Sequence, residues 1–339
     1  MRSTRRQFVG GLVASAACGT DATLAAEPIV EPEAAVVDEQ LPAWRMAMGP
    51  LEDLSPDQAA WLVDAAGHEP PSARALAIAA RHHEAEQTVV DYLLERPNRP
   101  TPERRTLVLC PLGNFPFDVI ELGGLVGLVR TPPLGELADL LSTSFGLPVE
   151  VLPERPLESR LFLSRRRGDV LQVDVHSLLE DLAPELPEHA YAMLALVNID
   201  LYASPEQHYA FGWSMHRGRL GVASFARFNP SLDGGGVRPD DLDRVICHRS
   251  ARLLAHEVAH MFGLAHCTYF RCLLGPVDVL ADLDALAAHL CPVCRMKLLR
   301  GADVDPIATT CATVASLEKL QLADDAAWAR LRTRSIHVG

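Results

Sequence analysis

The alternation of hydrophobic and polar positions along the chain predicts strands that are interleaved with helices. Short apolar or β-branched runs at residues 106–110, 149–152, 193–199 and 221–228 are each expected to form a strand. The run 193–199 is almost continuously apolar, which is typical of a strand that is buried on both faces. Strands that alternate with helices in this way indicate a mixed α/β fold.

Helices are predicted where apolar residues recur with a helical period and where capping residues mark an end. Ser55 followed by proline is typical of a helix start, and Gly67 of a helix end. Longer helices are expected over the ranges 72–95, 171–182, 239–262 and 314–331. The residues around the start of the range 171–182 also alternate as a strand would, so a strand is the second interpretation there.

The first 40 residues have the layout of an export signal followed by a linker. Arg5 and Arg6 stand before a short, mildly apolar run, and residues 4–9 resemble a twin-arginine signal. We therefore expect residues 1–26 to be a signal peptide that directs export to the periplasm or the extracellular space. Residues 27–40 are acidic and contain proline, and are expected to form a flexible linker.

Two other interpretations of this start remain open. The arginines also suit the basic amphipathic start of a cytoplasmic protein. A lipid anchor on Cys18 is the third interpretation, although Ser15 stands where a lipoprotein signal has an aliphatic residue. The chain contains no stretch of 18 or more apolar residues, so we expect no helix that spans a membrane.

The length and charge of the chain narrow the class of protein. With 339 residues, 48% of them hydrophobic, the chain is long enough to bury a sizeable core. It has 31 lysine and arginine residues against 44 aspartate and glutamate residues, a formal net charge of −13. A chain this acidic is repelled by phosphate backbones, so we expect no nucleic-acid partner.

The strongest chemical signal is the segment HEVAH on a predicted amphipathic helix. His256 and His260 are four residues apart and share one helix face, where both imidazoles can bind one ion. Glu257 lies on the neighbouring side of the helix, where it can contact a water on that ion. Gly263 favours a sharp turn after the helix, which lets His266 return as a third ligand. Three neutral imidazoles with an open position are typical of a catalytic zinc site.

The alternative is a helix whose histidines are ordinary core residues with hydrogen-bond partners. Three imidazoles clustered in an apolar stretch have polar atoms that are costly to bury alone, so a metal ion is the simpler explanation. The extended pattern HEVAHMFGLAH also fixes two more positions than the bare HExxH motif.

A second candidate metal site follows the third histidine. Four cysteines lie within one short segment: Cys267, Cys272, Cys291 and Cys294. Four thiolates suit a tetrahedral structural zinc, and the C-x-x-C spacing favours a metal over two disulfides, which export would permit. The remaining cysteines beyond the signal follow no pattern and are expected to be free and buried. They are Cys110, Cys247 and Cys311.

These motifs resemble those of the archaemetzincin branch of the metzincin metallopeptidases. The resemblance rests on HEVAHMFGLAHC, on the cysteine five residues further on, and on CPVCRMKL at 291–298. It also includes LCPLGNF at 109–115, NIDLY at 198–202 and GVASFARFNP at 221–230. It covers roughly residues 106–322, and the helical stretch 41–102 is a less clear part of it.

The resemblance implies a zinc metallopeptidase. In that family pattern His256, His260 and His266 would bind the catalytic zinc, and Glu257 would be the general base toward the zinc-bound water. The four cysteines of the second cluster would hold a structural zinc, which makes two zinc ions per chain. The substrate would be a peptide or a protein.

The resemblance also implies an α/β (α+β) fold of the metzincin type. It would consist of a mixed, twisted sheet with backing helices, an active-site helix and a small zinc-stabilised C-terminal subdomain. Residues 41–102 would form an N-terminal helical region, and residues 103–335 the catalytic domain. The strand around 220–224 would border the cleft and pair with an extended peptide.

One residue departs from the family pattern. The family has methionine two residues after the second cysteine, beneath the zinc, and here Leu274 stands in that position. Leucine and methionine have similar volumes, so the packing is expected to be retained.

Two rival hypotheses about the function stay open. One is a catalytically silent zinc-binding protein, which Leu274 favours. The other is a zinc ribbon that contacts nucleic acid, which the negative charge disfavours.

Overall fold

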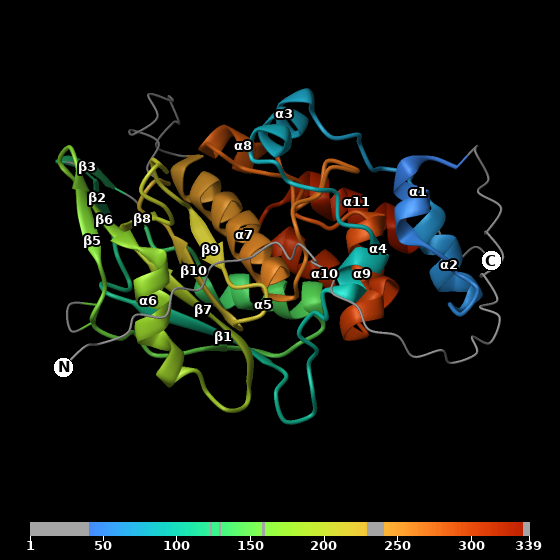
Figure 1. The fold of residues 1–339 in the computed structure, drawn as a ribbon, viewed down its shortest axis with the longest axis horizontal. Coiled ribbons are helices and arrows are strands. Elements are labelled where there is room, and N and C mark those ends of the chain that lie inside the picture. The colour runs from blue at the N-terminus through green and yellow to red at the C-terminus, as the bar shows by residue number, and fades with distance from the viewer. Residues whose placement is uncertain (1–40, 123, 129, 158–159, 229–240, 335–339) are drawn as a thin grey trace, which may run out of the picture. The chain divides into compact units, whose positions relative to one another are not determined.

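The apolar run around Met193 forms the central strand of a five-stranded sheet in the computed structural model of the chain (Figure 1). The strands follow the order β4-β1-β7-β10-β9 across the sheet. In that order their bounds are Val149–Val151, Thr106–Leu112, Ala190–Val197, Leu220–Ser224 and Gly212–Ser214. The first four strands are parallel and β9 is antiparallel to β10, so the sheet is mixed, as expected. All eight residues of β7 are buried, which confirms the prediction for this run.

The structure describes residues 41–334, with gaps at 123, 129, 158–159 and 229–240. The predicted signal peptide and acidic linker, together with Cys18, lie outside the described residues. The described part belongs to one compact unit that begins at Leu41. Within that part, no helix has both the length and the apolar character that crossing a bilayer requires.

Hydrophobic side chains cover both faces of the sheet, because neighbouring strand residues point to opposite sides. On one face, Leu107 and Leu194 belong to the larger core, together with α5 (Leu134–Phe145) and α7 (Leu242–Met261). On the other face, Val108 and Met193 pack with α6 (Val175–Leu182). The site-bearing helix α7 is therefore fixed between the sheet and α5.

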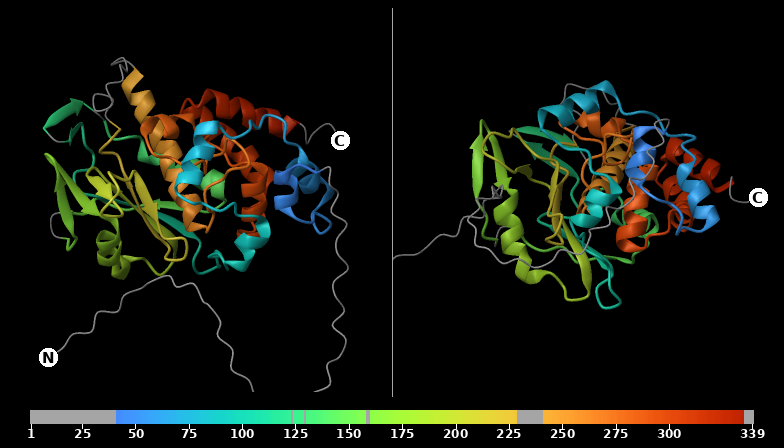
Figure 2. Two further views of the ribbon diagram at one scale, coloured as in Figure 1. Left: turned by 45° about the horizontal axis from the view of Figure 1, so that its top comes forward. Right: turned by 45° about the vertical axis from the view of Figure 1, so that its right-hand side comes forward.

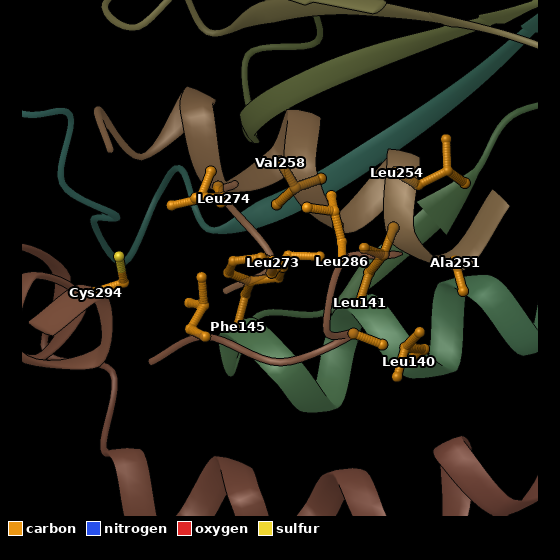
Figure 3. Close-up of a cluster of buried hydrophobic side chains, with 14 of the residues drawn as sticks. Leu140, Leu141, Phe145, Ala251, Leu254, Val258, Leu273, Leu274, Leu286 and Cys294 are labelled. Carbon is orange, nitrogen blue, oxygen red and sulfur yellow. The ribbon is translucent and has the colours of Figure 1, made fainter. Parts of the chain in front are cut away.

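The contact between α5 and α7 includes the turn that follows α7 (Figure 3). Leu141 and Phe145 of α5 lie near Leu254 and Val258 of α7, and Leu273 and Leu274 fill the space beside them. The figure also labels Leu140, Ala251, Leu286 and Cys294 in this cluster. The turn is thus part of the core rather than a surface loop.

Two smaller sheets complete the β structure of the described residues. β2 (Val119–Leu122) and β3 (Leu125–Leu128) form a hairpin, while β5 (Ser164–Arg167), β6 (Val170–Asp174) and β8 (Asp200–Tyr202) form a three-stranded sheet. A short 3-10 helix, η1 (Ala183–Glu185), follows α6. The C-terminal helices are α8 (Leu280–Ala285), α9 (Pro292–Ala302), α10 (Pro306–Lys319) and α11 (Ala323–Arg334). In both views of Figure 2, these orange-to-red helices lie on one side of the green and yellow strands.

Four short helices precede the sheet in the sequence. They are α1 (Ala43–Met48), α2 (Pro56–Val63), α3 (Ala73–Arg81) and α4 (Val89–Leu94). Ser55 caps α2 as predicted, because its side chain accepts a hydrogen bond from the backbone N–H of Gln58. Three of these helices, α1, α2 and α4, pack against α9, so this region is built onto the C-terminal helices.

Two predicted helices are divided in the structure. The prediction of one helix over 72–95 is wrong, because α3 ends at Arg81 and His83 has a left-handed φ of 55°. Thr88 then starts α4 with a capping box to Asp91. The helix predicted over 314–331 is likewise divided between α10 and α11, where Gln321 has a φ of 58°.

Other boundaries follow from local hydrogen bonds. Residues 170–182 contain both of the elements that were considered there: β6 ends at Asp174, whose side chain accepts from the N–H of Ser177 and so begins α6. The predicted strand 221–228 ends at Ser224. The helix predicted over 239–262 is confirmed as α7.

Candidate active site and metal centres

The last turns of α7 and the bend after it bring the three predicted histidines together. His256, Glu257 and His260 lie on α7 and are all buried. The helix ends at Met261, and Gly263 two residues later has a φ of 86° and donates its N–H to the His260 carbonyl at 2.8 Å. This left-handed bend reverses the chain and returns His266 to the other two rings.

The three imidazoles converge through one nitrogen each. The ring centroids of the pairs 256–260, 260–266 and 256–266 are 4.6, 4.9 and 5.3 Å apart. One ligand atom from each ring lies within 4.8 Å of the other two. The structure therefore gathers the predicted ligand set at one point.

The other ring nitrogen of each histidine is held by an acceptor. Nδ1 of His256 lies 2.8 Å from the Leu273 carbonyl, and Nδ1 of His260 lies 2.6 Å from the Leu264 carbonyl. Nδ1 of His266 lies 2.7 Å from Oε1 of Glu84. A carbonyl or carboxylate oxygen only accepts, so each Nδ1 carries the proton and each Nε2 presents its lone pair.

This donor arrangement fits a zinc ion. The Nε2 atoms of His256 and His260 are 3.0 Å apart, and two lone pairs at that distance repel unless a cation lies between them. Burial lowers the pKa of His256 to about 3 and that of His260 well below its usual value, so a shared proton is disfavoured. Tetrahedral bonds of about 2.1 Å would separate two nitrogens by roughly 3.4 Å, close to the observed distance.

Glu257 lies beside this cluster in a site that favours the protonated carboxyl. Burial raises the pKa of Glu257 to about 7, and a hydrogen bond from Ser214 opposes this rise. The Ser214 hydroxyl donates to Oε2 at 2.7 Å. On the same strand, Gly212 faces the carboxylate so closely that an added Cβ would lie 2.6 Å from its Cδ. Strand β9 thus fixes the position of Glu257.

The cluster opens into a cleft of about 1160 Å³. The three histidines, Glu257, β9 and the segment after α3 all contribute to its lining. β9 is the edge strand of the sheet, whereas β10 pairs with β7 on one side and β9 on the other. The expectation that the strand 220–224 borders the cleft and pairs with a peptide is therefore wrong, since its backbone already pairs on both sides and β9 is the strand with a free edge.

The four predicted cysteines form a second cluster beneath the turn. All four are buried, and their sulfur atoms lie within 4.8 Å of one another. The sulfurs of Cys267 and Cys291 are 3.6 Å apart, far beyond the roughly 2.05 Å of a disulfide and close to the roughly 3.8 Å between thiolates on one zinc. The structure describes all four as free thiols, which suits a metal rather than the alternative of two disulfides.

Surrounding groups suit negative charge on these thiols. The backbone N–H of Cys291 lies 3.3 Å from the Cys272 sulfur. Arg295 is buried nearby, and burial lowers its pKa to about 10 while the neighbouring thiols oppose this shift. A buried cation next to four thiolates offsets part of the charge that remains after one divalent ion is bound.

The turn between the two clusters carries leucine where the family pattern has methionine, and its backbone contacts both clusters. Leu274 is fully buried, and its carbonyl accepts the Cys267 N–H at 2.7 Å. The preceding carbonyl, of Leu273, holds His256. The backbone of this turn therefore orients a ligand of each cluster, whatever the side chain at position 274.

Sequence reasoning missed several residues of the site. Glu84, Gly212 and Ser214 contact the predicted residues but lie far from them in the chain. His216 was also missed, and its ring stacks on that of His260 with centroids 5.3 Å apart. Nothing in the local spacing marks these positions. Among the pattern-free cysteines, Cys110 is buried as expected, but Cys247 is partly exposed and Cys311 is exposed, because it lies on the outer face of α10.

Comparisons with known proteins find similarity to archaemetzincins. Residues 188–300 match the model of peptidase family M54. Archaemetzincin-2 of Macaca fascicularis is 24% identical over 223 residues, which cover 59% of this chain and 60% of that protein. Archaemetzincin of Thermococcus kodakarensis is 32% identical over 115 residues, 34% of this chain and 59% of that protein. The chain thus spans about 60% of the length of these two relatives.

Solved archaemetzincin structures are also similar. The structure from Methanopyrus kandleri has a TM-score of 0.42 and 23% identity, and the match covers 60% of this chain and 97% of that one. The residues matched by the family model, 188–300, contain every histidine and cysteine of the two clusters. These similarities support the resemblance of the chain to the archaemetzincins, peptidase family M54.

Proposed function

We propose that the chain is a zinc-dependent peptidase in which Glu257 is the general base. The observation that carries the proposal is the convergence of three Nε2 atoms beside a buried carboxylate at the bottom of a cleft. The match of residues 188–300 to the model of a peptidase family supports the same reaction class. His256, His260 and His266 would hold the catalytic zinc, and the four clustered cysteines a structural one, two ions per chain.

The chain's own residues supply the proton transfer. A zinc ion in the three-histidine site would polarise the scissile carbonyl and lower the pKa of a water molecule. Glu257 takes the proton of the attacking water and passes it to the leaving amine, for which a pKa near neutrality is suited. Because Ser214 occupies Oε2, Oε1 is the oxygen that receives the proton.

The edge strand β9 suits an extended peptide substrate. Its backbone is paired with β10 on one side only, and its residues line the cleft next to Glu257. A peptide that adds to this edge gains main-chain hydrogen bonds of the sheet type. The scissile bond would then lie beside the histidine cluster.

The Glu257→Gln variant tests the assignment. It keeps the shape of the side chain but cannot accept the proton, so hydrolysis of a peptide library should fall by about 100- to 10,000-fold. Both zinc ions should remain, as measured by metal content per chain. Unchanged hydrolysis in this variant would reject Glu257 as the base.

A catalytically silent zinc protein is the second candidate, and Leu274 in place of methionine is the observation that favours it. Measurements on the wild-type protein distinguish the two functions. A peptidase cleaves members of the library and loses this activity when zinc is chelated. A silent protein holds two zinc ions and leaves every peptide intact.

We further propose that the protein is exported in its folded, zinc-loaded form, on the basis of the twin-arginine-like residues 4–9. Replacing Arg5 and Arg6 with lysine should leave the protein in the cytoplasm, as measured by cell fractionation. Unchanged export of this variant would argue for a different route.

A further inference from the structure

The segment between α3 and α4, residues 82–88, reaches the bend that carries His266. The helix break at His83 makes this possible, because a continuous helix would carry these side chains past the site. Both ends of the segment are anchored. On α3, Arg74 forms a two-pronged ion pair with Asp282, and on α4 the Tyr92 hydroxyl donates to the Phe262 carbonyl at 3.0 Å.

Gln87 bridges the bend from this side. Its side chain is buried, its amide nitrogen donates to the Gly263 carbonyl at 3.2 Å, and its oxygen accepts the Ala265 N–H at 3.0 Å. The ammonium group of Lys297 donates to the same oxygen at 3.1 Å. One side chain thus fixes the two backbone groups between which the chain turns toward His266.

Glu84, from the same segment, contacts the side chain of His266 directly. Its Oε1 accepts from Nδ1 of His266 at 2.7 Å. Its Oε2 is buried and has no hydrogen-bond partner among the described residues. A carboxylate that is partly removed from water in this way needs positive charge nearby, which a metal ion on the far nitrogen of the same ring would supply.

His266 differs from the other two histidines in what holds it. Backbone carbonyls of the family-matched region orient His256 and His260, whereas a side chain 182 residues away orients His266. Glu84 also lies outside the matched residues 188–300. The third ring is therefore the one whose orientation depends on a separate region of the chain.

We propose that the segment 82–88 is an integral part of the three-histidine metal centre, with Glu84 as the positioning residue for His266. This inference rests on the proposed zinc site. The Glu84 carboxylate fixes the tautomer and orientation of the ring and makes Nε2 a better donor. Removing such a partner typically weakens metal binding by about 10- to 100-fold.

The test compares Glu84→Ala and Glu84→Gln with the same two substitutions at Glu86. Glu86 is exposed in the same segment, and its carboxylate accepts a 3.5 Å hydrogen bond from Thr268. The full chain is equilibrated with Zn²⁺ at buffered free concentrations, and bound zinc per chain is measured at both sites. Glutamine keeps an acceptor without the charge, so it should partly rescue the alanine defect.

We expect two zinc ions per chain in the wild type. In the Glu84 variants, zinc affinity should fall selectively at the three-histidine site. Glu84→Ala should lower the zinc affinity of the three-histidine site by about 10- to 100-fold, and Glu84→Gln should lower it by less. The Glu86 variants should change this affinity by less than about twofold. In the Glu84 variants, zinc binding at the four thiols should be unchanged. The unfolding temperature measured with zinc at the thiols alone should also equal that of the wild type. These two results would separate a positioning role of Glu84 from general damage to the fold.

Two results would overturn the inference in different ways. Equal zinc affinity in Glu84→Ala and the wild type would remove Glu84 from the metal centre while leaving the peptidase proposal intact. A wild-type chain that binds zinc at the four thiols alone would refute the three-histidine site, and with it both proposals.

Discussion

Glu257, the proposed general base, shows how single residues set the chemistry of this site. Glu257 is buried, which favours its protonated form, and the Ser214 hydroxyl offers it one hydrogen bond that favours the ionised form. The absence of a side chain at Gly212 lets β9 approach the carboxylate closely. The position of this group is thus decided by two neighbours on one strand.

Gly212→Ala should displace the proposed base, Glu257, and leave zinc binding intact. The new methyl group would lie 2.6 Å from Glu257 Cδ, so the carboxylate or the strand has to move. A misplacement of this size can cost about 100-fold in rate. We expect kcat to fall by that order, with two zinc ions retained per chain.

Gly135→Ala is the matched control for this change. Gly135 lies on α5, and an added Cβ meets no atom within 4 Å. Its activity should equal that of the wild type. If Gly212→Ala were as active as this control, the close approach of β9 would not matter for catalysis.

The turn between the two clusters shows how one element serves both of them. Within residues 267–274, the Leu273 carbonyl holds His256, while Cys267 and Cys272 contribute thiols to the second cluster. The segment carries few regular hydrogen bonds of its own, since α8 begins only at Leu280. We infer that a metal ion at the four thiols would stabilise the turn that supports the three histidines.

Cys272→Ser should therefore affect both sites. We expect the zinc at the thiols to be lost and the unfolding temperature to fall by at least about 5 °C, because a structural metal contributes directly to folding. The zinc affinity of the histidine cluster should fall as well, since the Leu273 carbonyl loses its support. Metal content and thermal unfolding measure the two effects.

Cys311→Ser provides the comparison for this variant. Cys311 is exposed on α10 and belongs to neither cluster. Both zinc ions and the unfolding temperature should be retained. A Cys272→Ser protein that behaved in the same way would show that the four thiols do not hold a structural ion.

At the scale of the whole molecule, the site joins regions that are distant in the sequence. α7 supplies two histidines and Glu257, β9 faces Glu257, and the segment after α3 reaches the third histidine. The helices α1, α2 and α4 pack on α9, which carries Cys294 near its start. Metal binding should accordingly stabilise the described unit as a whole.

Removing the metal should lower the stability of the entire unit. A ligand that binds only the folded state adds about 4 kcal/mol at a thousand times its dissociation constant. Treatment with EDTA should therefore lower the unfolding temperature and abolish activity, and added Zn²⁺ should restore both. The magnesium-saturated chelator is the control, and an equal effect of that control would exclude zinc as the cause.

The sequence predicted the main strands, the helix α7 and the residues of both candidate metal sites, which the structure brings together. These depend on short-range geometry: a helix places residues four apart on one face, and a glycine allows the left-handed bend at Gly263. The helix boundaries were less predictable. The helical period continued through His83 and Gln321, although the backbone of both residues is left-handed, with φ of 55° and 58°.

Tertiary structure alone decided which groups surround the predicted ligands. Glu84 and His266 are 182 residues apart, and Ser214 and Glu257 are 43 apart. The order of strands also decided that β9, rather than β10, has the free edge at the cleft. Such contacts arise when separate elements pack, and no local period encodes them. The chain's spacing determined which atoms can bind metal, and packing determined which neighbours orient them.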